Sequence, residues 1–344
     1  MKHYNVIAID LAKSVFQVCV ITYQGKVLFN KTMSRAKLLA YLVQQSKALV
    51  AMESCGGSSY WGRMASSFGH DVMIIPAKQV KPFRTGHKTD ANDALAIAVA
   101  CRAPNILKAR CLSIEEQGMQ SVDRMRSLVS RQKLQLSNQL RGLLLEFGIV
   151  INKGESAFKT RLPEILEDAE NDLPPVMRKS LYQLWQLYLR IGLDYDELDK
   201  NVKRVAKQDH QCQRLTQLEG IGPIGAIQLK LQLVQDHFKN GRQASACIGL
   251  TPQQHSSGGK TNLGGIKRLP SEHPLRSTLF LGARSVVSRL KSRPAKTVKE
   301  RWLKAIIDRR GSNRAAIALA NKNVRTAYAM LKNDSDYCST VIAT

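Results

Sequence analysis

Apolar residues in the first third of the chain fall into short runs that glycine or polar segments separate. The β-branched runs predict strands, and the amphipathic stretches between them predict helices. The expected strands cover 4–9, 15–21, 27–29, 49–52 and 72–75, and the expected helices cover 34–46 and 59–68. A basic loop over 78–88 precedes another helix that begins near Asp90. Three strands followed by strand–helix units predict a mixed sheet with helices on its faces.

The period of the apolar pattern lengthens after Ile114. Apolar residues recur every three or four positions over 114–147 and 175–207, which predicts two long amphipathic helices. They form either a coiled-coil arm that dimerises or an internal helical subdomain, and the pattern favours neither. The acidic stretch 157–172 between them is expected to be loosely structured. Two further helical patterns, rich in basic residues, follow between 275 and 331.

These patterns divide the chain into four expected parts. Residues 1–112 form an α/β domain, and 113–208 form a helical region that includes the possible coiled coil. Residues 209–332 form a mainly α-helical C-terminal domain, and 333–344 form a poorly ordered tail.

Four carboxylates occupy the places where such a sheet usually carries its site. Asp10 ends the first strand, Glu53 ends the fourth, and Asp90 and Asp93 lie one turn apart at a helix start. Clustered carboxylate oxygens suit Mg²⁺ or Mn²⁺, and paired ions of this kind catalyse phosphoryl transfer. The structural alternative is that Asp90 caps the helix and Asp93 is a solvated charge. The order of all four acids favours a metal site.

The third region contains two glycine-bearing segments. Gly220 and Gly222 lie between helical patterns and resemble a helix-hairpin-helix turn, whose exposed backbone N–H groups can bind phosphate. Ser256 and Ser257 precede two glycines and Lys260, which predicts an exposed, flexible loop with a lysine that can meet a phosphate. A serine hydroxyl is a weak nucleophile until a base or metal activates it. From local sequence alone, a phosphate-binding or merely flexible loop is the favoured interpretation.

The charge balance points to a polyanionic partner. Lysine and arginine number 52 against 27 acidic residues, a formal net charge of +25 that is spread along the chain. Nucleic acid is the leading candidate, and Lys78, Lys81, Arg84 and Lys88 are candidate contacts in the basic loop. No apolar run is long enough to span a membrane, and no signal peptide is expected. Seven scattered cysteines without C-x-x-C spacing indicate reduced thiols in the cytoplasm and no structural zinc site.

Taken in order, the motifs resemble a known family across nearly the whole chain. They are Ala8-Ile9-Asp10-Leu11-Ala12-Lys13, Met52-Glu53-Ser54-Cys55-Gly56, Lys88-Thr89-Asp90-Ala91-Asn92-Asp93-Ala94, Gly220-Ile221-Gly222-Pro223, Phe238-Lys239-Asn240-Gly241-Arg242, Gly249-Leu250-Thr251-Pro252, Ser256-Ser257-Gly258-Gly259-Lys260 and Ala318-Leu319-Ala320-Asn321-Lys322. The chain resembles insertion-sequence transposases that join an N-terminal RuvC-like (RNase H-type) DEDD domain to a C-terminal serine-bearing transposase domain. Pilin-gene invertases are related.

The resemblance implies a mechanism and partners. Asp10, Glu53, Asp90 and Asp93 become ligands of Mg²⁺, with Mn²⁺ as an alternative. Ser257, with Ser256 as the near alternative, becomes the nucleophile that attacks DNA and forms a covalent phosphoserine intermediate.

The family resemblance also implies an assembly with nucleic acids. Its members are bacterial, nucleoid-associated homo-oligomers, dimers or tetramers, whose active sites combine domains of different protomers. A structured guide RNA, called bridge or seeker RNA, pairs with donor and target DNA. One departure lies at 267–273, where Lys267-Arg268-Leu269-Pro270 replaces the usual Ser/Thr-Lys-x-Gly pattern, which puts the shape of this loop in question.

Three other functions deserve comparison. A RuvC-like, structure-selective DNA endonuclease would use metal-activated water and would need the acids but neither the serine nor an RNA. A non-enzymatic nucleic-acid binder would not need the acids. A sugar-kinase-like or actin-like ATPase would need glycine-rich phosphate loops, which the first 110 residues lack.

Overall fold

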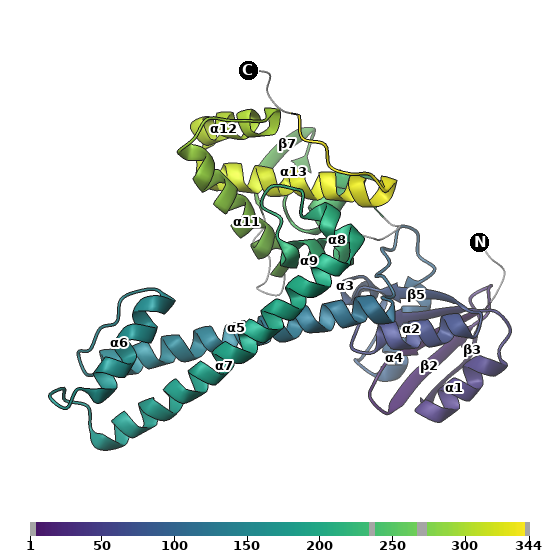
Figure 1. Ribbon diagram of the computed structural model, residues 1–344. Helices are drawn as coiled ribbons and strands as arrows, with labels where there is room; N and C mark the ends of the chain where they lie inside the picture. The colour runs from purple at the N-terminus through teal and green to yellow at the C-terminus, as the bar shows by residue number, and fades with distance from the viewer. Residues whose placement is uncertain (1–4, 234–237, 267–273, 341–344) are drawn as a thin grey trace. The chain divides into compact units, whose positions relative to one another are not determined.

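The computed structural model describes residues 5–233, 238–266 and 274–340 (Figure 1). The chain forms two compact units. The first comprises residues 1–117 with 235–239, and the second comprises 118–234 with 240–344. The finer boundaries expected near 112, 208 and 332 remain predictions.

The first unit is built on a five-stranded mixed sheet in the order β3-β2-β1-β4-β5. The strands are β1 (Val6–Asp10), β2 (Val15–Ile21), β3 (Val27–Ser34), β4 (Leu49–Glu53) and β5 (Asp71–Ile75). β1 and β3 pair antiparallel with β2, whereas β4 pairs parallel with both β1 and β5. The predicted mixed sheet is therefore confirmed, with all five strands in the expected places.

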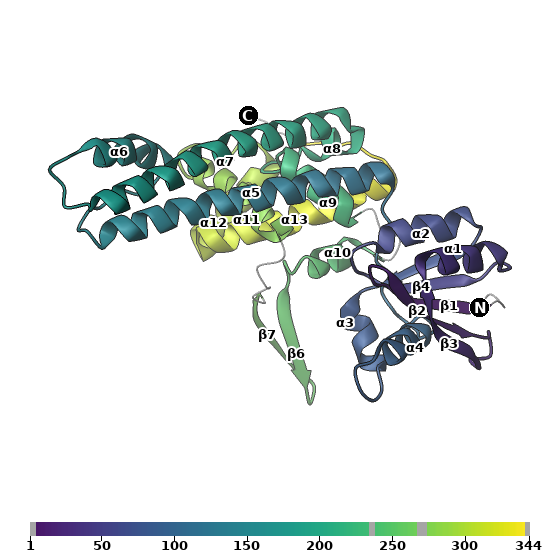
Figure 2. The ribbon, with the colours of Figure 1, turned by 90° about the horizontal axis from the view of Figure 1, so that it is seen from below.

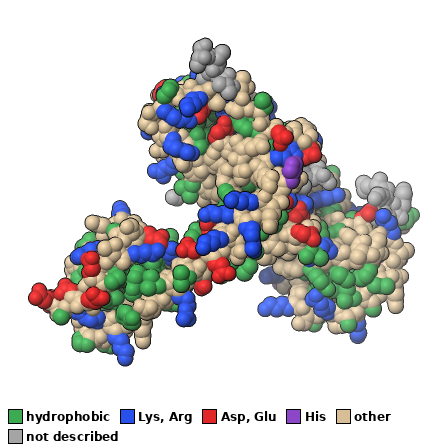
Figure 3. All heavy atoms as spheres, viewed as in Figure 1, with side chains coloured by type: hydrophobic (Ala, Val, Ile, Leu, Met, Phe, Trp, Pro, Cys, Tyr) green, Lys and Arg blue, Asp and Glu red, His purple; other side chains and the backbone are tan. Residues whose placement is uncertain are grey.

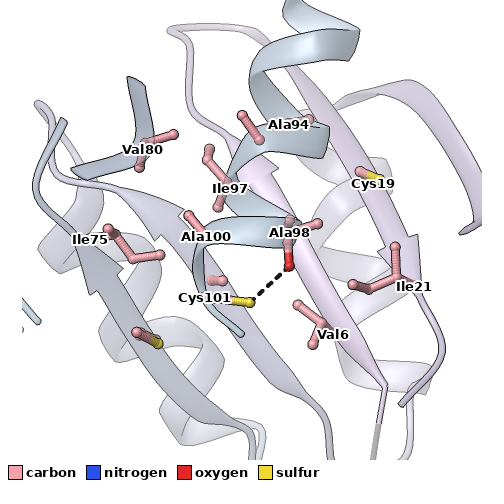
Figure 4. Packing of buried hydrophobic residues seen from close by; sticks show 14 residues of the cluster. Val6, Cys19, Ile21, Ile75, Val80, Ala94, Ile97, Ala98, Ala100 and Cys101 are labelled. Atoms are coloured by element: carbon pink, nitrogen blue, oxygen red, sulfur yellow. Dashed lines mark hydrogen bonds between the residues drawn. The ribbon is translucent and has the colours of Figure 1, made fainter. Parts of the chain in front are cut away.

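Alternating residues of each strand pack against helices on opposite faces of this sheet. Ile7 and Ile9 of β1 face α1 (Arg35–Gln44) and α2 (Ser58–Ser67), which cover one side. Val6 and Ala8 face α4 (Asp90–Ala100) on the other side. Figure 4 shows this second layer, where the Cys101 thiol donates to the Ala98 carbonyl over 3.2 Å. The central strands β1, β2 and β4 are therefore buried on both faces, whereas the edge strand β3 is largely exposed.

The segment expected as a basic loop is partly helical. It contains α3 (Ala77–Val80) and the 3₁₀ turn η1 (Lys81–Phe83) before the extended residues that lead into α4. Pro82 fits the first turn of η1, and Val80 is buried against α4.

Two long helices, α5 (Ile114–Leu145) and α7 (Pro175–Gln208), run antiparallel to each other (Figure 2). Both belong to the second unit, except for the first four residues of α5. The ion pair of Arg126 with Asp199 joins them over 3.8 Å. Along the chain, α6 (Glu155–Glu167) lies between these two helices. The expectation of loose structure over 157–172 is therefore wrong for most of that segment. Its apolar spacing, with Phe158 and Leu162 fully buried, was the helical signal, and the internal Pro163 obscured it. The coiled-coil description of α5 and α7 remains a prediction.

The rest of the described part of the second unit contains further helices and a β-hairpin. The helices are α8 (His210–Leu215), α9 (Pro223–Leu233), α10 (Gly241–Cys247), α11 (Pro274–Lys291), α12 (Val298–Arg310) and α13 (Ser312–Asn333). The two patterns expected between 275 and 331 are thus three helices, because Gly311, at φ 81°, separates α12 from α13. The hairpin consists of β6 (Pro252–Ser257) and β7 (Lys260–Ile266).

The C-terminal segment is attached to the helices of this unit rather than poorly ordered. The buried guanidinium of Arg214 forms ion pairs with Asp334 and with Asp336, the latter over 3.1 Å. The Tyr337 hydroxyl donates to Glu219 over 3.1 Å, and Val298 N–H donates to the Thr340 carbonyl. The expectation of a loose tail is therefore wrong for residues 334–340, whose acids neutralise a buried charge.

Candidate functional site

The four predicted acids come from three elements of the first unit. Asp10 is the last residue of β1 and Glu53 is the last residue of β4. These strands are parallel neighbours, so both carboxylates leave the same edge of the sheet. Asp90 and Asp93 lie in the first turn of α4, which packs on β1 and β2.

Local hydrogen bonds fix the start of α4. The Thr89 hydroxyl, rather than Asp90, caps the helix by accepting from the Asn92 N–H over 3.3 Å. The side chain of Asn92 donates to the His87 carbonyl, and Asn30 of β3 donates to the Ala91 carbonyl, both over 2.8 Å. The structural alternative in which Asp90 caps the helix is therefore wrong. The Asp90 carboxylate does not cap α4.

The electrostatics of Asp10 show that the acids act on one another. Burial, followed by the charges of Asp93, Asp90 and Glu53, raises the pKa of Asp10 from 3.8 to about 6, against a smaller opposing effect of Lys88. Burial and the charge of Asp93 also raise the pKa of Glu53, while Arg84 lowers it. The charges of Asp93, Asp90 and Glu53 thus all act on Asp10 at this end of the sheet.

A cation of the chain already lies at this cluster. Arg84 Nη1 is 3.2 Å from Asp93 Oδ1, and both side chains are partly buried. Within the described ranges, no three His, Cys, Asp or Glu side chains are arranged to hold a metal ion as they stand. The donor set itself, hard oxygens in excess negative charge, fits a divalent cation such as Mg²⁺.

The other basic-loop residues are on the surface. Lys78, Lys81 and Lys88 are exposed, whereas Arg84 is only half-exposed. The nucleic-acid contact expected of Arg84 stays a prediction, and the sequence gives no sign of its ion pair with Asp93. The helix start expected near Asp90 is confirmed, but its cap is Thr89, a residue type that favours the N-cap position and directly precedes Asp90.

The two candidate serines lie at the tip of the β6–β7 hairpin, which Figure 2 shows. Gly258 and Gly259 both have positive φ, at 54° and 76°, as a two-residue type I′ turn requires. Ser257 pairs in register with Lys260, and Ser256 pairs with Thr261. The expected loop is therefore a hairpin, because paired glycines favour this turn; the serines are exposed, as predicted.

Alternation along β6 places the two serines on opposite faces. The Ser256 hydroxyl lies 3.4 Å from the Thr261 hydroxyl and accepts from Gln254 over 3.0 Å. The Ser257 face carries His255 and Lys260 instead. Within the described residues, no hydrogen bond engages the Ser257 hydroxyl. The two hydroxyls therefore differ in environment as well as in direction.

Gly220 serves packing in the helical unit. Its φ is 84°, and a Cβ there would meet the Gly282 carbonyl of α11 at 2.8 Å. Gly222, by contrast, has open space around it. Close helix packing alone accounts for Gly220, whereas the phosphate-binding role predicted for Gly220 and Gly222 stays a prediction.

Comparison with known proteins identifies the family of the chain. Residues 7–149 match the DEDD transposase family model, and residues 212–299 match the model described as "Transposase IS116/IS110/IS902 family". The transposase for insertion sequence element IS1111A of Coxiella burnetii is 35% identical over 98% of this chain and 92% of its own length. The chain belongs to the IS110/IS116 family of transposases.

Other members of this transposase family align over similar lengths. A probable family 20 transposase of Pseudomonas aeruginosa is 36% identical over 96% of this chain and 98% of its own. The IS1328 transposase of Yersinia enterocolitica is 33% identical over 95% of this chain and 97% of its own length. IS110 transposases are enzymes that cleave DNA and transfer its strands.

A solved structure also aligns with the chain. T. thermophilus RuvC in complex with a Holliday junction substrate matches 28% of this chain and 92% of its own, with 15% identity and a TM-score of 0.23.

In the part of the transposase that the structure describes, no helix is both long and apolar enough to cross a membrane. The departure predicted at 267–273 lies outside the described residues.

Proposed function

We propose that this chain is a Mg²⁺-dependent DNA transposase that cuts and rejoins DNA through a covalent phosphoserine at Ser257. The observation that carries the proposal is the concentration of Asp10, Glu53, Asp90 and Asp93 at one sheet edge, with the pKa of Asp10 raised to about 6. Such repulsion is costly in an empty site and is relieved by a bound cation.

The acids are proposed to hold the metal, with Mn²⁺ as an alternative to Mg²⁺. Bound divalent ions supply charge stabilisation at the phosphate and a lowered pKa for an attacking hydroxyl or water. The chain itself holds the carboxylates on strands and a helix. Asp93 pairs with Arg84 in the absence of metal, and a divalent cation would replace Arg84 as its partner. Lys88 holds a further positive charge beside this cluster.

The serine step is a phosphoryl transfer with a balanced exchange of bonds. The Ser257 oxygen forms a bond to phosphorus while the bond from phosphorus to a deoxyribose oxygen breaks. The serine proton leaves, and the released oxygen takes up a proton. Lys260 lies opposite Ser257 in the hairpin and offers a charge for the phosphate. Ser256, held by Gln254 and Thr261 on the other face, is the alternative.

The proposed partners are nucleic acids and further copies of the chain. A net charge of +25 suits donor and target DNA together with a structured guide RNA, and Figure 3 shows basic side chains over the visible surface of both units. Lys78, Lys81 and Lys88 are proposed DNA contacts. Exposed apolar side chains on α5 and α7, such as Leu145 at 59% and Leu193 at 73%, support assembly into a dimer or tetramer.

The second candidate is a structure-selective DNA endonuclease that uses metal-activated water. It is favoured by one observation, namely that all four acids lie in the first unit, whereas the hairpin belongs to the second. The two functions differ in whether protein becomes covalently attached to DNA.

A denaturing gel of reactions with Mg²⁺, element-end DNA and RNA from the element's flank tests the proposal. The wild-type chain is expected to give a protein–DNA adduct that resists denaturant. Ser257→Ala and Asp10→Ala are both expected to remove it, whereas Ser256→Ala retains it.

Each other outcome changes the assignment. Loss of the adduct in Ser256→Ala alone moves the nucleophile by one residue. Cleavage without an adduct, unaffected by either serine substitution, supports the water-using endonuclease. Omitting the RNA tests the guide separately, because a guided enzyme loses site selection while a structure-selective nuclease does not.

A further inference from the structure

A groove in the second unit lies between α5, the start of α6 and α7. Its volume is about 740 Å³, within the roughly 300–1,000 Å³ that small-ligand sites occupy in proteins. Ser130 and Asn138 of α5 line it together with Gly154, Tyr188 and Tyr195. All of its lining residues belong to the second unit, and the groove contains none of the acids or hairpin residues assigned above.

The walls of the groove carry an excess of positive charge. Arg131, Lys133, Arg141 and Lys153 line it, against the single acid Glu155. Lys133 and Lys159 both pair with Glu155, at 2.7 and 2.8 Å, and lower its pKa to about 2, so its charge is already balanced. Arg131 and Lys153 are exposed and form no ion pair among the described residues. Two cations are therefore available to an anionic ligand.

Arg141 adds a fixed cation to the wall of the groove. Its guanidinium lies 4.4 Å from the ring centre of Phe158 and donates to the Gly154 carbonyl over 2.8 Å. Its Nε is buried and lacks a partner within the described ranges. An unpaired buried donor of this kind commonly marks a place where water or a ligand completes the hydrogen bonds.

The groove also offers a flat apolar surface. Tyr195 is half-buried there, and the exposed side chain of Leu134 lies along the wall. The Lys133 ammonium lies between the rings of Tyr188 and Tyr195, 5.7 and 5.4 Å from their centres. It thereby holds both rings in place. An aromatic ring next to unpaired cations is the combination by which proteins bind an unstacked base and its phosphate.

We propose that this groove binds one unstacked nucleotide of a single-stranded nucleic acid. The base lies against Tyr195, and Arg131 and Lys153 hold the flanking phosphates. A duplex does not fit this role, because its bases are stacked and paired. Binding in this groove is independent of the metal and of Ser257. The binding proposal can therefore be wrong while the proposed transposase chemistry is right, and the chemistry can be wrong while the binding proposal is right.

Photo-crosslinking locates the bound base directly. The full-length protein is irradiated, without Mg²⁺, with single-stranded oligonucleotides that carry 5-bromouracil, and peptides are mapped by mass spectrometry. Separate RNA and DNA strands of the same sequence show which sugar the groove prefers. We expect a crosslink at Tyr195 with at least one single strand and none with the duplex. Crosslinks confined to other parts of the chain would overturn the proposal.

Affinity measurements by fluorescence anisotropy give a second test. Tyr195→Ala is expected to weaken single-strand binding roughly tenfold, whereas Tyr195→Phe retains it. Tyr182, an exposed residue of α7 outside the groove, provides the control Tyr182→Ala, which should change little. Equal losses in Tyr195→Ala and Tyr182→Ala would overturn the assignment.

The charged residues require a control for net charge. The double variant Arg131→Gln with Lys153→Gln is expected to reduce the salt dependence of single-strand binding by about 1.4 in log–log slope, since each phosphate contact contributes about 0.7. Arg190→Gln with Lys200→Gln removes the same charge from exposed positions of α7 outside the groove. If both doubles change the slope equally, the groove has no special role.

Discussion

The acid cluster and the serine hairpin present their proposed reactive groups in opposite ways. Asp10 and Glu53 end neighbouring strands of a sheet that is covered on both faces, and their pKa values are raised because the surroundings are partly buried. Ser256 and Ser257 are exposed on a two-stranded ribbon whose geometry depends on one glycine turn. Rigid burial suits groups that must hold fixed spacing, and an exposed tip suits a nucleophile that must reach DNA.

The largest expected effect comes from the rigid site. Asp10→Asn removes one proposed metal ligand, so DNA cleavage should fall about a thousandfold or more, and the rise in melting temperature on adding Mg²⁺ should disappear. Gel assays of strand cleavage and thermal unfolding measure the two effects. Asp71→Asn is the control, since Asp71 begins β5 and pairs with Lys47 over 3.3 Å. Cleavage by Asp10→Asn at wild-type rates would contradict the metal assignment.

The hairpin turn should matter for attachment to DNA but not for metal binding. Replacing Gly258 and Gly259 by alanine forces two residues with side chains to positive φ, at about 1–2 kcal/mol each. We expect adduct formation to fall at least tenfold while the Mg²⁺-induced rise in melting temperature stays unchanged. Gly258→Asn is the matched control, because Asn-Gly also favours a type I′ turn. Equal adduct yields from all three proteins would show that the turn geometry is unimportant.

A smaller effect should appear in the pH dependence of stability without metal. Because the pKa of Asp10 is raised from 3.8 to about 6, the folded state binds its proton more tightly than the unfolded state. The resulting stabilisation is present at low pH and is lost as pH rises through about 6. Partial exposure limits it to roughly 1 kcal/mol.

Chemical unfolding in EDTA at about pH 5 and about pH 7.5 measures this difference. Asp10→Asn should flatten the dependence, and saturating Mg²⁺ should reverse it in the wild type, since the cation favours the ionised carboxylates. An unchanged pH profile in Asp10→Asn would mean that Asp10 is not the titrating group.

The smallest expected effect concerns Arg84. Arg84→Ala removes the cation that competes for Asp93, so Mg²⁺ should bind roughly two- to fivefold more tightly in the absence of DNA. Isothermal titration calorimetry measures the affinity, and Lys81→Ala, an exposed change in the same segment, is the control. Weaker Mg²⁺ binding in Arg84→Ala would instead mean that Arg84 orients Asp93 for the ion.

The sheet and its acids were predictable because their signals are local. Short β-branched runs predict two of the strands, and Asp10 and Glu53 mark where these strands end. The convergence of Asp90 and Asp93 on that edge followed from the expected packing of a helix on the sheet. The electrostatic effects of the acids on Asp10 agree with that prediction.

Other features depend on contacts that spacing does not encode. The pairing of Arg84 with Asp93 requires the turn of η1 to bring them together, and the sequence alone allowed a phosphate contact equally well. The docked tail depends on Arg214, which lies far from Asp334 along the chain. The hairpin was missed for another reason, because strands of polar residues such as Gln253, Gln254 and His255 lack the apolar alternation of a buried sheet.

The attachment of the tail has a consequence for gene decay. A late nonsense mutation that removes residues after Asn333 deletes no proposed reactive group, yet it strips Arg214 of the carboxylates that neutralise it inside the helical unit. Copies of the element with such a mutation should produce an unstable protein rather than a shorter enzyme.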